Sequence, residues 1–157
     1  MIPPSYDVIS DNPVESREDI VKSLSFLYTL KRPYTLTIFS LRVFPRTKLW
    51  NYFETHPDHD IRKIGTSYLE ARKTISNILL YVLAIGKLPP KLFFFLLKRV
   101  KGYNEDQPTY PVLFLLVKSM YLAVRAVEHL RKRDYTNIVG SGAYIAWKAA
   151  HIFGKRI

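Results

Sequence analysis

The sequence contains no cysteine among its 157 residues, which excludes disulfides and every metal site or iron–sulfur cluster held by thiolates of this chain. It also lacks a secretory signal, because residues 2–5 are too few and are broken by prolines. The most hydrophobic segment, residues 112–133, is interrupted by Lys118 and Arg125, and falls short of the roughly eighteen uncharged residues typical of a membrane span. We therefore expect a cytoplasmic protein without a transmembrane helix.

Acidic residues are scarce in the second part of the chain. Residues 1–60 carry seven Lys or Arg and eight acids, a net charge of −1, whereas residues 61–157 carry seventeen and five, a net charge of +12. An excess of this size is typical of a chain that meets an anionic partner, which would be nucleic acid, a membrane surface or a phosphorylated substrate. A solvated basic helical surface has the same composition, so both interpretations stay open.

The chain opens on a short apolar run that ends in a turn. Val8 and Ile9 are β-branched and favour a packed strand. Turn-forming residues from Asp11 to Pro13 stop this run. The pattern predicts a strand that ends at about Ser10.

A helix and a second strand are expected next. Ser16 is a suitable N-cap, and Asp19 completes a capping box three residues later, so the helix should begin near Arg17. A second apolar run, residues 35–41, is too continuous for a sheet wetted on one face. The sequence therefore predicts a strand, helix, parallel strand unit.

Parallel sheets bind ligands at the carboxyl ends of their strands. Here those ends lead into two turns, residues 11–15 and 42–47, which we expect to line one site. An ordinary turn followed by a helix cap would need the same residue types in the first of them. A ligand site and a purely structural turn are the two interpretations.

Two segments resemble motifs of the radical S-adenosylmethionine (radical SAM) enzymes. Residues 7–16, Asp-Val-Ile-Ser-Asp-Asn-Pro-Val-Glu-Ser, resemble the fifth-strand pattern D-x-I-x-G-x-P-x-E-T, which contacts the adenosyl cofactor. The Asp-Asn-Pro form, in place of Gly-x-Pro, is similar to members with a cobalamin-binding domain upstream. Residues 38–49 resemble the sixth strand and the P-G-T-x-L turn after it, with Arg46 in place of the usual glycine. The resemblance covers residues 5–56.

The resemblance implies an α/β fragment, the last two β/α units of a partial TIM-type barrel, in residues 1–58. An all-α region, residues 59–157, would follow, so that the chain is mostly helical overall. Because the [4Fe–4S] cluster needs cysteine ligands that this chain lacks, the chain would be the C-terminal portion of a longer enzyme and not competent alone. S-adenosylmethionine would be shared with a missing N-terminal half, which would bind the cluster and, in the cobalamin-dependent members, cobalamin.

The resemblance also implies roles for individual side chains. An apolar residue of the strand would contact adenine, two residues of the turn would lie beneath it, a carboxylate would fix the turn from the helix start, and two apolar residues would close the other side. In that order these residues are Ile9, Asp11 and Asn12, Glu15, and Leu41 and Phe44. No metal ligand is expected, and the histidines and aspartates of residues 56–60 are expected in a loop.

The second part of the chain is expected to be helical, over residues 61–85, 92–100, 112–133 and 137–153. In residues 92–100 a run of three phenylalanines lies between lysines and an arginine. That pattern is typical of a helix lying on a membrane surface, but a buried helix looks the same, and we favour burial. The alternative function is therefore a basic helical module that binds an anionic membrane surface or nucleic acid without catalysis, peripherally on a membrane in the first case.

Overall fold

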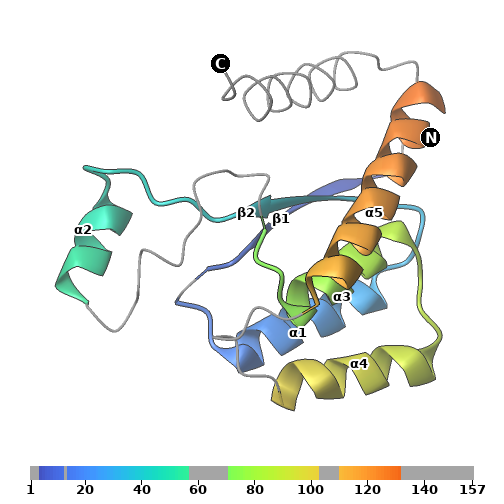
Figure 1. The fold of residues 1–157 in the computed structure, drawn as a ribbon, viewed down its shortest axis with the longest axis horizontal. Coiled ribbons are helices and arrows are strands. Elements are labelled where there is room, and N and C mark those ends of the chain that lie inside the picture. The colour runs from blue at the N-terminus through green and yellow to red at the C-terminus, as the bar shows by residue number, and fades with distance from the viewer. Residues whose placement is uncertain (1–3, 13, 57–70, 103–109, 132–157) are drawn as a thin grey trace, which may run out of the picture. The chain divides into compact units, whose positions relative to one another are not determined.

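The fold was obtained as a computed structural model, which describes residues 4–12, 14–56, 71–102 and 110–131 (Figure 1). The chain divides into two compact units, residues 1–118 and residues 119–157. The elements follow one another in the order β1 (Ser5–Ser10), α1 (Arg17–Thr29), β2 (Thr35–Ser40), α2 (Lys48–Thr55), α3 (Ile75–Ile85), α4 (Pro90–Gly102) and α5 (Pro111–Arg131). The described part is thus mostly helical, with two strands that alternate with helices before a helical region.

The two strands form a parallel pair, in register from Ser5 opposite Thr35 to Ser10 opposite Ser40. This confirms the predicted strand, helix, parallel strand unit and the end of the first strand. The expected burial concerned the second strand, β2, in which four of the six residues are buried. Strand β1 is more open, and Ser10 alone is buried in it. The reason is that α3 packs against β2, whereas β1 makes its main contacts with β2 itself.

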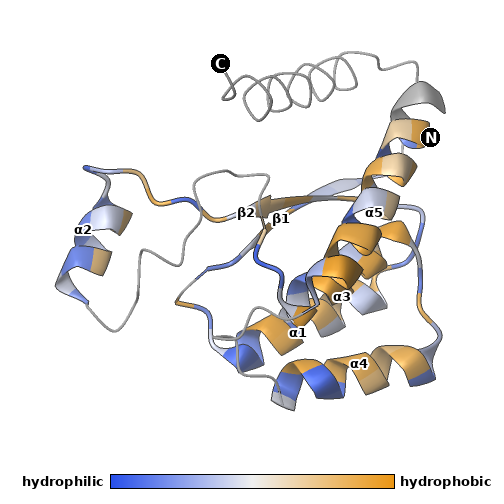
Figure 2. Cartoon of the chain, viewed as in Figure 1, coloured by the Kyte–Doolittle hydropathy of each residue, from blue (hydrophilic) through white to orange (hydrophobic). Residues whose placement is uncertain are grey.

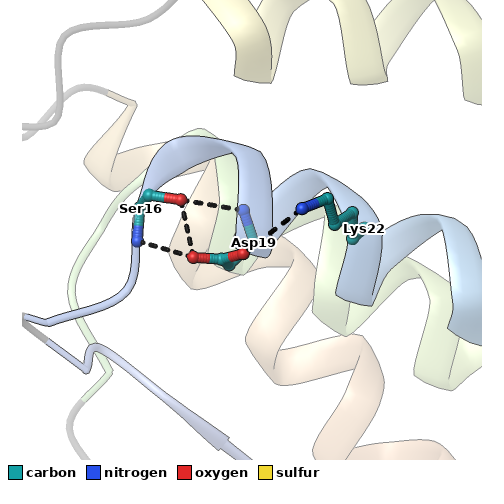
Figure 3. A network of polar contacts seen from close by, with 3 residues as sticks. All are labelled: Ser16, Asp19 and Lys22. Carbon is teal, nitrogen blue, oxygen red and sulfur yellow. Dashed lines mark hydrogen bonds and ion pairs between the residues drawn. The ribbon is translucent and has the colours of Figure 1, made fainter.

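Helix α1 begins with the predicted capping box, drawn in Figure 3. The Ser16 hydroxyl accepts a hydrogen bond from the Asp19 backbone N–H at 3.2 Å, and the Asp19 carboxylate accepts one from the Ser16 backbone N–H at 3.2 Å. The Asp19 pKa lies below its ordinary value, chiefly because of hydrogen bonds from Ser16 and then because of the nearby Lys22 charge. The helix start is therefore fixed by residues that are local in sequence.

Helices α1 and α4 run antiparallel and are joined at both ends. The Arg17 guanidinium donates to the Lys101 carbonyl oxygen at 3.2 Å, which links the start of α1 to the end of α4. Near the other end the rings of Tyr28 and Phe93 stack with centroids 3.9 Å apart. The Tyr28 hydroxyl also donates to the carbonyl oxygen of Leu88, just before α4. One face of α4 is thereby held against α1.

Helix α3 begins later than the sequence predicts. The expected helix over residues 61–85 is wrong for residues 71–74, because Thr74 has an extended backbone and caps α3 by accepting from the Asn77 backbone N–H. Residues 57–70 lie outside the described residues. The predicted end at Gly86 is confirmed, since its N–H closes the helix on the Val82 carbonyl.

The remaining helices fit the prediction with shifted ends. Helix α4 spans two more residues at each end than the expected 92–100, and α5 begins one residue before the expected 112–133. The predicted helix over residues 137–153 lies outside the described residues. None of the described helices is long and apolar enough to cross a membrane.

Elements on both sides of residue 58 belong to the first compact unit, residues 1–118. Helix α3, for example, packs against both α1 and β2. Residue 58 itself lies outside the described residues, so the expected division between residues 1–58 and 59–157 stays a prediction.

Candidate functional site

The carboxyl ends of β1 and β2 lie side by side, as a parallel pair requires. Beyond the last register pair, the Leu41 backbone N–H donates to the Ser10 carbonyl oxygen at 2.8 Å. The Ser10 hydroxyl donates to the Phe39 carbonyl oxygen at 3.2 Å. The two turns predicted to line a site therefore start from one shared edge.

Asp11 holds this edge together. Its carboxylate accepts hydrogen bonds from the Ser40 hydroxyl at 2.7 Å and from the Arg72 backbone N–H at 2.9 Å. Its other oxygen accepts from the Asn77 side-chain amide at 2.7 Å, and this amide also donates to the Arg72 carbonyl oxygen at 2.8 Å. Protein donors engage both carboxylate oxygens. Asp11 therefore connects β1 to β2 and to the start of α3.

Asn12 and Glu15 lie in a tight turn between that edge and α1. The Asn12 side-chain oxygen accepts from the Val14 backbone N–H at 3.2 Å, and the Asn12 carbonyl oxygen accepts from the Glu15 backbone N–H at 3.2 Å. Glu15 is half-buried and directly precedes the N-cap Ser16. The turn is thus followed directly by the capping box at Ser16, so Glu15 lies between two hydrogen-bonded segments of the backbone.

The apolar candidates are more accessible. The Ile9 side chain is 59% exposed and the Phe44 side chain 51% exposed, while Leu41 is half-buried. Ile9 lies opposite Phe39 in the register, and neighbouring residues of a parallel pair share a face. The structure brings Ile9, Asp11 and Leu41 to the shared edge, whereas Phe44 lies further along the second turn.

Backbone conformation marks two positions in these turns. Asp11 has a φ of 61° and Arg46 a φ of 66°, both in the left-handed region that favours glycine. In the motifs that the two segments resemble, these two positions usually carry glycine. Asp and Asn tolerate this region better than other side chains do, so Arg46 is the more unusual of the two.

Sequence reasoning missed three buried polar residues at the edge: Ser40, Arg42 and Asn77, with exposed fractions of 3%, 8% and 3%. A signal was present for Asn77, which interrupts the apolar run of α3, since a buried amide needs partners. Ser40 carried a weaker signal, as a polar residue at the end of an apolar strand. Asp11, which accepts hydrogen bonds from both Asn77 and Ser40, was predicted as a site residue, but its contacts with them were not predicted.

Among the described residues no group of three or more His, Cys, Asp or Glu could hold a metal ion. Exposed Ile9 and Phe44 offer apolar surface of the kind that packs against a ring.

Comparisons of the chain with protein-family models, with curated proteins and with solved structures give no match.

Proposed function

We propose that the chain is the C-terminal portion of a radical SAM enzyme, of the kind that binds cobalamin, and forms the last two parallel strands of its barrel together with a helical region. The observation that carries the proposal is the left-handed backbone at Asp11 and Arg46. Both positions align with glycines of two separate motifs, although neither residue is glycine. A chance match of letters would not require the backbone conformation for which glycine is used.

Other features support the same assignment. The two motifs lie on a parallel strand pair joined through α1, and the turns after both strands start from one edge. Ile9 is exposed where the motif requires a contact with adenine. The Asn12 turn and Glu15 precede the capped helix in the order that the motif implies.

The proposed roles follow from the resemblance to the two motifs. Ile9 contacts the adenine ring, Leu41 and Phe44 close the apolar side, and Asp11 and Asn12 keep the intervening turn in place, with Glu15 fixing it from the helix start. When bound beside a [4Fe–4S] cluster, S-adenosylmethionine supplies a 5′-deoxyadenosyl radical, so that the cofactor performs the difficult chemistry. The cluster requires thiolates, which this chain does not contain. The cluster is therefore assigned to a missing N-terminal half, the proposed partner. The resemblance assigns cobalamin to the same half, and we propose that the enzyme lies in the cytoplasm.

The first test is the DNA sequence upstream of the first codon. The proposal requires a continuous or adjacent reading frame that encodes a Cys-x-x-x-Cys-x-x-Cys motif. A different gene immediately upstream, with no such motif within reach, would contradict it.

The second test measures S-adenosylmethionine binding on the joined protein after anaerobic reconstitution. Ile9→Ala should weaken binding by about tenfold, because an apolar side chain buried against a ligand contributes about 1.5 kcal/mol or more. Val14→Ala is the matched control, since Val14 is also exposed, at 43%, and is not assigned a cofactor contact. Equal binding by wild type and the Ile9 variant would remove Ile9 from the site.

A further inference from the structure

The outward face of α4 is composed almost entirely of two kinds of residue. Phe94, Phe95 and Leu92 are exposed, Phe94 by 60% and Phe95 by 54%. The other exposed residues between the two ends of the helix are the bases Lys91, Lys98, Arg99 and Lys101. Figure 2 shows the helix passing from an apolar part to a strongly hydrophilic end. The Arg99 guanidinium lies 5.4 Å from the Phe95 ring centroid, so bases and aromatics are interleaved.

The opposite face of α4 is fixed in the fold, so the outward face is not simply the side of a loosely packed helix. Phe93 is 1% exposed and stacks on Tyr28, and Leu97 and Val100 are also buried. Arg17 holds the end of the helix through the Lys101 carbonyl oxygen. The helix therefore presents its aromatic and basic residues to the outside in a defined orientation.

Helix α4 and the segment before it carry charge of one sign, although α1 beside them has Glu18 and Asp19 in its first turn. Residues 71–102 contain seven Lys or Arg and no acid. A mixed surface of both signs would suit solubility alone, whereas a one-sign field beside exposed aromatic rings attracts an anionic surface that can also accept apolar groups.

The apolar residues favour a lipid surface over nucleic acid. Aromatic rings can stack on unpaired bases, but the aliphatic Leu92 adds nothing to phosphate or base recognition. Leu92 is 44% exposed on the same face as the two phenylalanines. Aliphatic groups gain free energy from entering the acyl region of a bilayer.

We propose that the outward face of α4 binds the surface of an anionic phospholipid bilayer, with Phe94 and Phe95 inserted at the headgroup boundary and Lys91, Lys98, Arg99 and Lys101 beside the phosphates. The helix lies in the plane of the interface. This inference is independent of the proposed radical chemistry, because it uses the helical region and none of the residues at the strand edge.

The test is co-sedimentation of the full chain with vesicles of phosphatidylcholine alone and of phosphatidylcholine mixed with phosphatidylglycerol, at low and high salt. Wild type should bind the mixed vesicles, and bind pure phosphatidylcholine at least about tenfold more weakly, since each base near an anionic surface contributes about fivefold in affinity. Salt should weaken binding without abolishing it, because the apolar contribution is not screened.

Two double variants separate the contributions. Phe94→Ser with Phe95→Ser, and Lys98→Gln with Arg99→Gln, should each weaken binding to the mixed vesicles by at least about tenfold. Phe26→Ser is the matched control, because Phe26 is 61% exposed on α1 and should leave vesicle binding within about twofold. Circular dichroism melts verify that every variant is folded.

Three results would overturn the proposal. The first is wild type that does not bind the mixed vesicles. The second is full vesicle binding by the Phe94 and Phe95 double variant, which would reduce the effect to general charge attraction. The third is single-stranded oligonucleotide that binds more tightly than vesicles and displaces them, which would make the face a nucleic-acid site.

Discussion

The Asp11 carboxylate accepts a hydrogen bond of 2.7 Å from the side-chain amide of Asn77, 66 residues further along the chain. The same carboxylate accepts from the Ser40 hydroxyl and the Arg72 backbone N–H. One side chain thus connects the ends of both strands to the segment that precedes α3. Because Asn77 is only 3% exposed, its amide has little access to water if Asp11 is removed.

Replacement of Asp11 by Ala should therefore lower the free energy of unfolding by about 3 kcal/mol, because hydrogen bonds to a charged group contribute about 1.5–3 kcal/mol and buried donors lose their acceptor. Denaturant titration measures the change. A double-mutant cycle with Asn77→Ala should give a coupling free energy of at least about 1 kcal/mol. Additive effects of the two substitutions would show that the contact contributes nothing of its own.

Glycine substitutions at the two left-handed positions should act in opposite directions. Arg46→Gly should raise the free energy of unfolding by up to about 1 kcal/mol. A left-handed non-glycine residue is strained by about 1–2 kcal/mol, and glycine removes this strain. Part of the gain is lost because glycine increases the conformational entropy of the unfolded chain. Asp11→Gly relieves less strain, because Asp tolerates this region better than Arg does, and it loses the carboxylate, so it should destabilise. Thermal melting compares the two. Destabilisation by Arg46→Gly would mean that the arginine side chain outweighs the strain.

Adjacent phenylalanines of α4 should differ sharply in their effect on folding. Phe93→Ala should lower the free energy of unfolding by about 3–5 kcal/mol, because the ring is buried on Tyr28 and its removal leaves a cavity. Phe94→Ala should lower it by about 1 kcal/mol or less, because the ring is largely exposed and loses only edge contacts with Tyr28 and Phe93. Guanidinium titrations of the two variants provide the measurement. Similar losses would place Phe94 in the core and remove it from the proposed membrane face.

The local parts of the fold were predictable because their causes are local. Ser16 and Asp19 lie three residues apart, and a capping box needs nothing beyond that spacing. The strand ends and the parallel pairing followed from apolar runs separated by a capped helix. The position of the turns followed from the same pairing.

The long-range parts were not predictable from these patterns. The start of α3 depends on Thr74 as a cap and on a preceding segment whose backbone is bound by Asp11, and a continuous helical pattern gives no sign of either. Exposure of Ile9 likewise depends on which strand α3 covers. In the candidate site, the motif predicted the types of residue and their order. The hydrogen-bond partners of Asp11 could not be predicted, because Arg72 and Asn77 are distant in sequence and approach it only in the folded chain.

The capping box should contribute to stability in a pH-dependent way. The folded-state pKa of Asp19 is below its ordinary value of 3.8, so its contribution is fully present above about pH 4 and is lost as the pH falls through the lowered pKa. The melting-temperature difference between wild type and Asp19→Asn should hence be constant near neutral pH and shrink in acid below that value. Ser16→Ala should cost about 1 kcal/mol at neutral pH. A difference that grows on acidification would contradict the direction of the shift.

The combined substitution Asn12→Ala with Glu15→Ala separates the functional and structural readings of the first turn. Loss of the Asn12 turn contact should cost about 1 kcal/mol of stability, whichever reading holds. If the turn positions the cofactor, the double variant should in addition bind S-adenosylmethionine about tenfold to a hundredfold more weakly, because small misplacement of a positioning group is expensive.

Equilibrium cofactor binding and thermal melting are to be measured on the same sample, in a protein that includes the upstream cysteine-bearing half. Ser16→Ala serves as the control, since it weakens the neighbouring helix cap by a similar amount without touching Asn12 or Glu15. Weaker binding in the double variant and normal binding in the control would assign the turn to the cofactor. Unchanged cofactor affinity with a lowered melting temperature in both would leave the turn as structure, because a stability loss shared with the control explains everything that was measured.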